Sequence, residues 1–309
     1  MNLGAVLRSA LLCGGFAAAL ATGGPAEVQA DPVAAWARFS PPRAVTIQGY
    51  GGDAMEPSLS RDGQVLVFNN RNDPPEQTDL HWARRIDDLT FHYEGLVAGA
   101  NSGDLDGVGT LTSGDRFCFI STRDWRQTLG TVFCSAWREG RAEPPILQAA
   151  ASPRIPGRLV FDLEQAADGQ TAILADGRFE GGAAPASADL RLARWIGGQY
   201  RLSPADDRLF AAVNTPGLEY APALSADGLT LAFTRLSGRP PFARIGLWIA
   251  RRPTSDAPFG APVRIAAATG FVEGPTFSPD GRSVYFHRRI GNRFSIWRVT
   301  LSPTARTGR

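Results

Sequence analysis

The sequence has 309 residues, of which 43% are hydrophobic and 20% charged, and its formal net charge at pH 7 is +2. A charge so near balance, without a large basic field, argues against a nucleic-acid partner. The length would fit one or two ordinary domains, but a closed array of repeats can use it as a single domain.

Residues 1–30 have the features of a secretory signal peptide. Arg8 precedes an Ala-rich apolar run from about Ala10 to Ala21, and Val28, Gln29 and Ala30 form an A-x-A-like cleavage site before Asp31. The run is short for a membrane span, so we expect no stable membrane insertion, with an uncleaved anchor as the alternative. Lipidation of Cys13 is disfavoured because Leu12 precedes it. A periplasmic or secreted protein is therefore predicted, with residues 31–42 as an N-terminal extension.

One short phrase recurs five times: an apolar segment, a tight turn with glycine, and a second apolar segment. The turn glycines are 51, 55, 59 and 53 residues apart, and the copies lie at Pro57–Phe68, Thr110–Phe119, Leu163–Leu174, Pro222–Phe233 and Pro275–Phe286. A period of this size indicates an array of similar units. Alternation with a period of two around Asp-Gly turns indicates β-hairpins. The turn geometry accounts for the repeated Asp and Gly without a binding role.

A third strand is predicted after each hairpin, at 80–85, 132–137, 190–195, 247–252 and 296–301. A fourth is predicted in the first four units, at 93–97, 145–148, 199–202 and 262–265. Four antiparallel strands per unit form a propeller blade. We therefore predict an all-β fold, a single β-propeller of four-stranded antiparallel blades over 43–302, with five blades favoured over six and a C-terminal tail at 303–309. Because the last unit lacks a fourth strand, Arg43 to Gln48 is expected to pair with Ser295 to Thr300 and close the ring.

Three of the turns carry a family resemblance. SRDG at Ser60 to Gly63, SADG at Ser225 to Gly228 and SPDG at Ser278 to Gly281 are each followed by a strand ending in Phe. They resemble the repeat of TolB-like, WD40-like (PD40) β-propellers. That family usually has six blades, and TolB carries an additional α/β domain ahead of its propeller. The resemblance therefore covers the propeller only and implies a binding scaffold.

Cys118 and Cys134 are predicted to form a disulfide across neighbouring strands of the second unit. If the hairpin loop is centred between Trp125 and Arg126, the two cysteines face each other. Two buried thiols are the alternative, since a shift of register by one residue would turn the side chains to opposite faces. An oxidising compartment favours the bridge.

Acidic residues precede each turn, on strands expected to line the central channel of a propeller. A ring of carboxylates could bind calcium, although a varying distance from the turn favours solvated loop acids instead. These channel-mouth acids are Glu56, Asp106, Asp162, Glu219 and Glu273. No other cofactor is expected, and His81, His92 and His287 lack the spacing of a zinc site.

Two functions remain open at this point. The favoured one is a non-catalytic scaffold that binds a protein, peptide or glycan through the loops after each second strand, where Trp and Arg could form a hot spot. The candidate residues are Asn70, Arg71, Arg123, Trp125, Arg126 and Arg288. The alternative is a glycan-active propeller enzyme that uses two or three of the channel carboxylates. Neither a G-x-S-x-G elbow nor a nucleotide-binding loop is present.

Overall fold

The computed structural model describes residues 35–72, 78–180, 185–238 and 242–302. The expected signal peptide and the tail at 303–309 lie outside these residues. Strands dominate the described chain, which confirms the all-β propeller prediction. Its helices are short, namely η1 (Ala35–Ala37), α2 (Trp125–Thr128), η3 (Ala149–Ala151) and η4 (Pro204–Phe210). Within the described ranges, none is long and apolar enough to cross a membrane.

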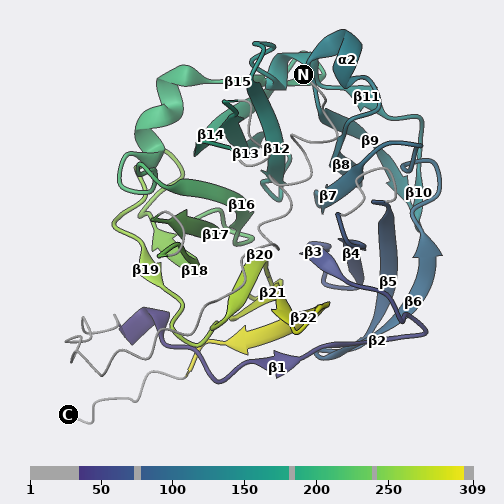
Figure 1. Ribbon diagram of the computed structural model, residues 1–309, viewed down its shortest axis with the longest axis vertical. Helices are drawn as coiled ribbons and strands as arrows, with labels where there is room; N and C mark the ends of the chain where they lie inside the picture. The colour runs from purple at the N-terminus through teal and green to yellow at the C-terminus, as the bar shows by residue number, and fades with distance from the viewer. Residues whose placement is uncertain (1–34, 73–77, 181–184, 239–241, 303–309) are drawn as a thin grey trace.

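The strands follow one another in successive antiparallel groups around a central axis (Figure 1). The first two groups are β3 (Met55–Leu59), β4 (Val65–Asn69), β5 (Leu80–Asp87) and β6 (Thr90–Leu96), then β7 (Asp106–Leu111), β8 (Arg116–Ser121), β9 (Val132–Arg138), β10 (Arg141–Ala142) and β11 (Ile146–Leu147). The next two are β12 (Arg158–Gln165), β13 (Thr171–Arg178), β14 (Ser187–Ile196) and β15 (Gln199–Leu202), then β16 (Leu218–Leu224), β17 (Thr230–Ser237), β18 (Arg244–Arg251) and β19 (Val263–Arg264). The last group is β20 (Phe271–Phe277), β21 (Ser283–Ile290) and β22 (Arg293–Thr300). The first strand of each group, β3, β7, β12, β16 or β20, lies nearest the axis (Figure 1).

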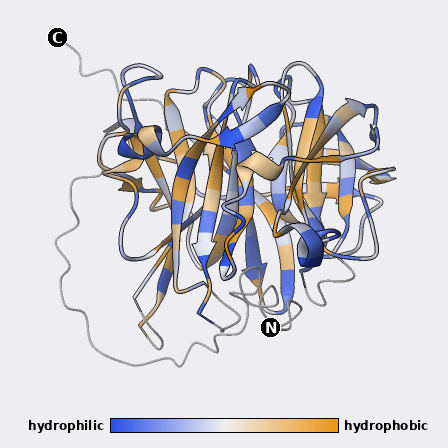
Figure 2. Cartoon of the chain, turned by 90° about the horizontal axis from the view of Figure 1, so that it is seen from above, coloured by the Kyte–Doolittle hydropathy of each residue, from blue (hydrophilic) through white to orange (hydrophobic). Residues whose placement is uncertain are grey.

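The repeated phrase forms the hairpin of the two innermost strands in each group. In the first turn Gly63 has a φ of 72°, and Asp62 Oδ1 accepts hydrogen bonds from Ser60 Oγ at 2.6 Å and the Gln64 amide at 3.0 Å. The geometry of the turn therefore accounts for both its Asp and its Gly. The phenylalanines that end the phrase pack between the sheets, and Phe68, Phe119, Phe233 and Phe286 are fully buried. Apolar and hydrophilic residues alternate along the strands in the perpendicular view (Figure 2).

The N-terminal segment joins the first and last groups, but not as one strand. β1 (Arg43–Ala44) pairs with Arg298 and Trp297 of β22, as expected. The chain then leaves β22, and β2 (Thr46–Gln48) runs parallel to Thr90–His92 of β6. Val45, which is buried between the two pairings, turns the chain from one sheet to the other. The single strand predicted over Arg43 to Gln48 is therefore divided between two sheets.

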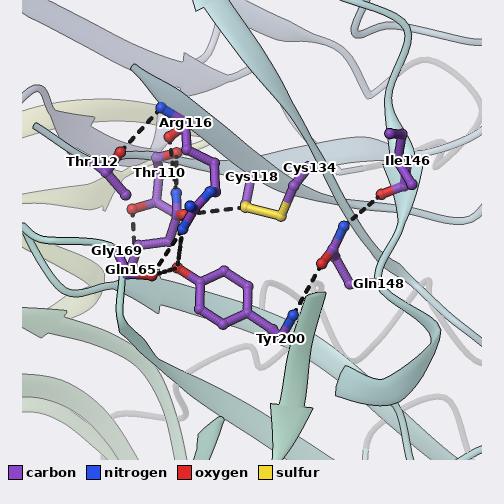
Figure 3. Close-up of a disulfide and its surroundings, with 10 residues drawn as sticks. All are labelled: Thr110, Thr112, Arg116, Cys118, Cys134, Ile146, Gln148, Gln165, Gly169 and Tyr200. Atoms are coloured by element: carbon purple, nitrogen blue, oxygen red, sulfur yellow. Dashed lines mark hydrogen bonds between the residues drawn. A yellow bond between two sulfur atoms is a disulfide. The ribbon is translucent and has the colours of Figure 1, made fainter. Parts of the chain in front are cut away.

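Cys118 and Cys134 form the predicted disulfide (Figure 3). The two residues are direct partners in the register of β8 and β9, with their Cα atoms 4.0 Å apart. Cys118 Sγ also lies 3.2 Å from Gln165 Oε1, which accepts a hydrogen bond from the Tyr200 hydroxyl at 3.0 Å. The bridge thus lies where the second group of strands packs against the third.

Removing the bridge should destabilise the fold without changing the site. The cysteines are 16 residues apart, and closing a loop of this length in the unfolded chain is worth about 3 kcal/mol. The double variant Cys118→Ala/Cys134→Ala should lose about that much unfolding free energy in urea titrations. The parent protein measured under reducing conditions is the control, and equal stability of parent and variant under oxidising conditions would contradict the prediction.

Candidate active site in the central channel

The inner strands enclose a cavity of about 20 Å³ on the axis of the ring. This volume is enough for one water molecule. Residues from β3, β7, β12, β16 and β20 line it, and its charged lining residues are Glu56, Asp162 and Glu164. The cavity is therefore the place where side chains of separate repeats meet.

A β-bulge in each inner strand decides which side chain reaches this cavity. The pairing skips two residues in four of these strands, and the first skipped residue has a positive φ: 46° at Glu56, 53° at Val108, 47° at Ala221 and 62° at Gly274. In β12 the pairing skips Phe161 alone, directly before Asp162. Bulges redirect side chains at functional sites. Because the bulge recurs, its strained backbone conformation is a property of the propeller scaffold. The repeats differ in the side chain that the bulge residue carries.

Glu56 contacts a fully buried histidine. Its backbone amide donates a hydrogen bond to His287 Nδ1 at 3.1 Å, and its Oε1 lies 3.8 Å from the same nitrogen. On the other side of the imidazole, His287 Nε2 lies 3.2 Å from Glu273 Oε2. The other oxygen of this carboxyl, Glu273 Oε1, accepts a hydrogen bond from the Tyr220 hydroxyl. Since Nδ1 accepts the amide proton, Nε2 carries the imidazole proton and donates it to Glu273.

Asp162 completes this group of residues, which we name the channel cluster: Glu56, Asp162, Tyr220, Glu273 and His287. Asp162 is only 2% exposed. Its Oδ2 accepts the Ala221 amide at 3.2 Å, while Oδ1 has no hydrogen-bond partner among the described residues. A buried oxygen with unused hydrogen-bonding capacity on a cavity wall is suited to contact a ligand or a water molecule.

Burial and like charge raise the pKa values of two carboxyls in the channel cluster. Burial raises the pKa of Glu56 to about 8; His287 opposes this shift, and Asp162 and Glu273 add to it. The pKa of Asp162 is also raised well above its usual value, mainly by burial, against the hydrogen bond from the Ala221 amide. Both carboxyls therefore keep a proton to higher pH than exposed carboxyls do, and pKa values displaced in this direction are typical of catalytic acids.

Arg61 closes the end of the channel on the side of the Asp-Gly turns. Its guanidinium donates hydrogen bonds to Glu164 Oε1 at 3.0 Å and to the carbonyl oxygens of Leu111, Gln165 and Leu224, which belong to three other groups of strands. Glu164 also accepts the Thr110 hydroxyl at 2.8 Å. Glu164 is therefore paired at this end of the channel.

In the structure, the five predicted channel acids fall into two sets. Glu56, Asp162 and Glu273 lie together in the channel cluster. Asp106 and Glu219 instead lie in buried ion pairs within their own groups, Asp106 with Arg123 at 2.6 Å and Glu219 with Arg235 at 2.7 Å. All five are buried, so none is the solvated loop acid favoured from the sequence. In the described part of the chain, no three acidic, His or Cys residues are grouped to hold a metal ion.

The predicted loop residues mostly serve the scaffold. Trp125 is 9% exposed and packs in the core, because α2 turns its ring inward. Arg123 pairs with Asp106 and stacks on Phe119 and Phe133.

The side chains of the other loop candidates contact partners outside the channel cluster. Arg71 pairs with Asp53 at 2.7 Å, Arg288 stacks on Trp297, and the Asn70 side chain accepts the Asp79 amide at 2.7 Å. Arg126 is exposed. Part of the loop from Asn69 to Asp79 lies outside the described residues.

His287, Tyr220, Gly274 and Arg61 were not among the residues singled out from the sequence. For His287, the spacing of the three histidines argues against a zinc site and indicates no other role. The available signal was its place in the second strand of the last repeat, opposite Glu273 in the first. The position equivalent to Glu273 in the preceding repeat, counted from the turn glycine, is Tyr220.

No protein-family model and no curated protein matches the sequence. Several solved structures are similar in fold. A glycoside hydrolase matches over 88% of this chain and 94% of its own, with a TM-score of 0.57 and 11% identity. Zg3597, a family 117 glycoside hydrolase produced by the marine bacterium Zobellia galactanivorans, covers 85% and 90%, with a TM-score of 0.52 and 12% identity. A thermostable family-43 glycoside hydrolase covers 82% and 90%, with a TM-score of 0.50 and 11% identity.

These likenesses show the propeller fold. The putative TolB from Agrobacterium tumefaciens is also similar, at 18% identity, but its TM-score of 0.31 is too low to carry an argument. The prediction of a non-catalytic binding scaffold is contradicted by the comparisons, because the three well-matched structures are glycoside hydrolases.

Proposed function

We propose that this protein is a glycoside hydrolase whose central channel holds the acid–base pair Glu56 and Asp162. The observation that carries the proposal is that both carboxyls line one cavity on the propeller axis. Glycosidases cleave the sugar bond between two such carboxyls, one protonated and one ionised. Burial raises the pKa of both carboxyls, and we place the catalytic proton on Glu56 because the hydrogen bond from the Ala221 amide opposes this rise at Asp162.

The proposed step is direct displacement by water. Glu56 donates its proton to the glycosidic oxygen while the bond to the anomeric carbon breaks. Asp162 Oδ1 accepts a proton from a water molecule, whose oxygen bonds to that carbon from the opposite face. Enzymes that invert configuration leave room for this water between their two carboxyls.

Glu273 has a different place in this mechanism. Tyr220 and His287 occupy its two oxygens, so it does not face the substrate. Its negative charge instead contributes to the raised pKa of Glu56, which keeps the proton available near neutral pH.

The fold comparisons and the sequence support the same proposal. The well-matched structures are glycoside hydrolases, and repeats that resemble the PD40 type supply the scaffold. We also infer export to the periplasm or the medium, since residues 1–30 have the features of a signal peptide and the protein contains a disulfide. A glycan is thus the proposed ligand.

The deciding experiment is a screen for hydrolysis. The purified protein is incubated with 4-nitrophenyl glycosides of common pyranoses and furanoses and with polysaccharides, and released nitrophenol and reducing ends are measured. NMR of the first product should show inversion at the anomeric carbon. Hydrolysis that persists undiminished in the double variant Glu56→Gln/Asp162→Asn would show that another site is responsible.

The pH dependence of both stability and activity should reflect the protonation of Glu56. Because its folded pKa of about 8 lies above the unfolded value of 4.5, the folded state binds more protons between these values. The unfolding free energy should therefore fall as pH rises from about 4.5 to about 8, and activity should fall above about pH 8. Urea titrations across this range check the first effect, and Glu56→Gln should show a smaller decrease. A stability that rises across this window would contradict the raised pKa.

A further inference from the structure

Gly274 is the bulge residue of the last repeat, and the backbone conformation alone does not explain why it is glycine. The equivalent bulge residues Glu56, Val108 and Ala221 carry side chains at φ values of 46° to 53°, whereas Gly274 has a φ of 62°. The scaffold therefore accepts side chains at this position in three other repeats. A local reason must apply to Gly274.

The local reason is the Glu56 carboxyl. A Cβ atom added to Gly274 would lie 2.5 Å from Glu56 Oε2 and 3.1 Å from His287 Nδ1. Both distances are shorter than ordinary van der Waals contact. The neighbours cannot move easily, because Glu56 is 8% exposed and His287 is fully buried and held by Glu273.

The imidazole restricts Glu56 from a second direction. His287 Nδ1 accepts the Glu56 amide proton, which fixes the bulge backbone that carries the carboxyl. Glu273 fixes the imidazole in turn, and the Tyr220 hydroxyl fixes Glu273. Residues of the fourth and fifth repeats thus determine the position of a side chain of the first.

We propose that Gly274 and His287 are positioning residues for Glu56: Gly274 leaves the space that the carboxyl occupies, and His287 anchors the backbone beneath it. Their role in turnover rests on the proposed function, but the packing does not. Filling the space with a methyl group would displace the carboxyl from its place beside the cavity. Displacement of a catalytic group by about 1 Å can lower the rate about 100-fold.

A double-mutant cycle, read out as melting temperatures, tests the packing and needs no substrate. Gly274→Ala is made in the parent and in the Glu56→Ala background. Gly281→Ala is the control for strain, since Gly281 has a φ of 66° and open space around it. Gly274→Ala should lower the melting temperature more than Gly281→Ala, and this excess should be clearly smaller in the Glu56→Ala background, where only the contacts with His287 Nδ1 at 3.1 Å and Glu56 Cα at 3.2 Å remain. An equal decrease in both backgrounds would overturn the proposal, because the glycine would then serve the backbone alone.

The role in turnover is tested with the glycoside found in the screen. Gly274→Ala should lower kcat about 100-fold with little change in KM, whereas Gly281→Ala should leave both unchanged. His287→Asn, whose amide oxygen can still accept the Glu56 amide proton, should keep more activity than His287→Leu. Unchanged kcat in Gly274→Ala would overturn the positioning role while leaving the proposed hydrolase intact. If the parent hydrolyses no glycan, the proposed function fails and the positioning role fails with it, while the melting-temperature cycle still decides the packing.

Discussion

Replacing Glu56 by Gln is expected to lower kcat for glycan hydrolysis about 100- to 10,000-fold, the range for loss of a general acid. Gln keeps the size of the side chain, but its amide is far too weak an acid to transfer a proton to the leaving oxygen. The backbone amide that donates to His287 is unchanged by the substitution, so the bulge should persist. Steady-state kinetics should show the loss in kcat with KM nearly constant.

Glu164→Gln is the matched control for this substitution. Glu164 lines the same cavity, but Arg61 and Thr110 hold its carboxyl. Its loss should cost stability and affect kcat far less than Glu56→Gln. A substrate with a highly acidic leaving group, such as a dinitrophenyl glycoside, needs little protonation and should restore much of the rate of Glu56→Gln. Equal losses in both variants on every substrate would argue against Glu56 as the acid.

Replacing Arg123 by Met should destabilise the protein by about 3–5 kcal/mol, the usual cost of leaving one partner of a buried ion pair. Asp106 is fully buried, and Arg123 lies 2.6 Å from its Oδ1. The guanidinium also donates to the Ala100 carbonyl oxygen and stacks on Phe119 and Phe133. Met fills part of the volume but leaves the carboxylate without its cation. Urea unfolding monitored by tryptophan fluorescence measures the loss.

Arg126→Met is the matched control, because Arg126 lies in the same loop and is exposed. Its substitution should change the unfolding free energy by no more than about 0.5 kcal/mol. A similar small effect in Arg123→Met would show that the Asp106 pair contributes little.

The scaffold could be predicted from the sequence because it is repeated. Every copy of the phrase has the same alternation and turn, so the hairpins and the register of Cys118 against Cys134 followed from counting. The N-terminal strand was predicted only in part. Its division at Val45 depends on packing between two sheets, which no local pattern encodes.

The site could not be predicted as accurately as the scaffold, because the bulges change which side chains face the axis. An acidic residue precedes every turn, yet skipped residues turn Glu56 toward the cavity and leave Asp106 beside Arg123. Strand alternation alone cannot distinguish these cases. His287 was missed for a related reason: its importance comes from Glu56, which is 231 residues away in the chain.

The division of the N-terminal segment between β22 and β6 also sets an order of assembly. Arg43 and Ala44 pair with residues made about 250 positions later, at Trp297 and Arg298. During synthesis the first repeat can form its own hairpins, and the disulfide can form within the second. The ring itself cannot close until the last repeat has emerged, and only then does His287 reach the Glu56 amide. A chain truncated within the last repeat would therefore lack a completed site even where its earlier repeats had folded.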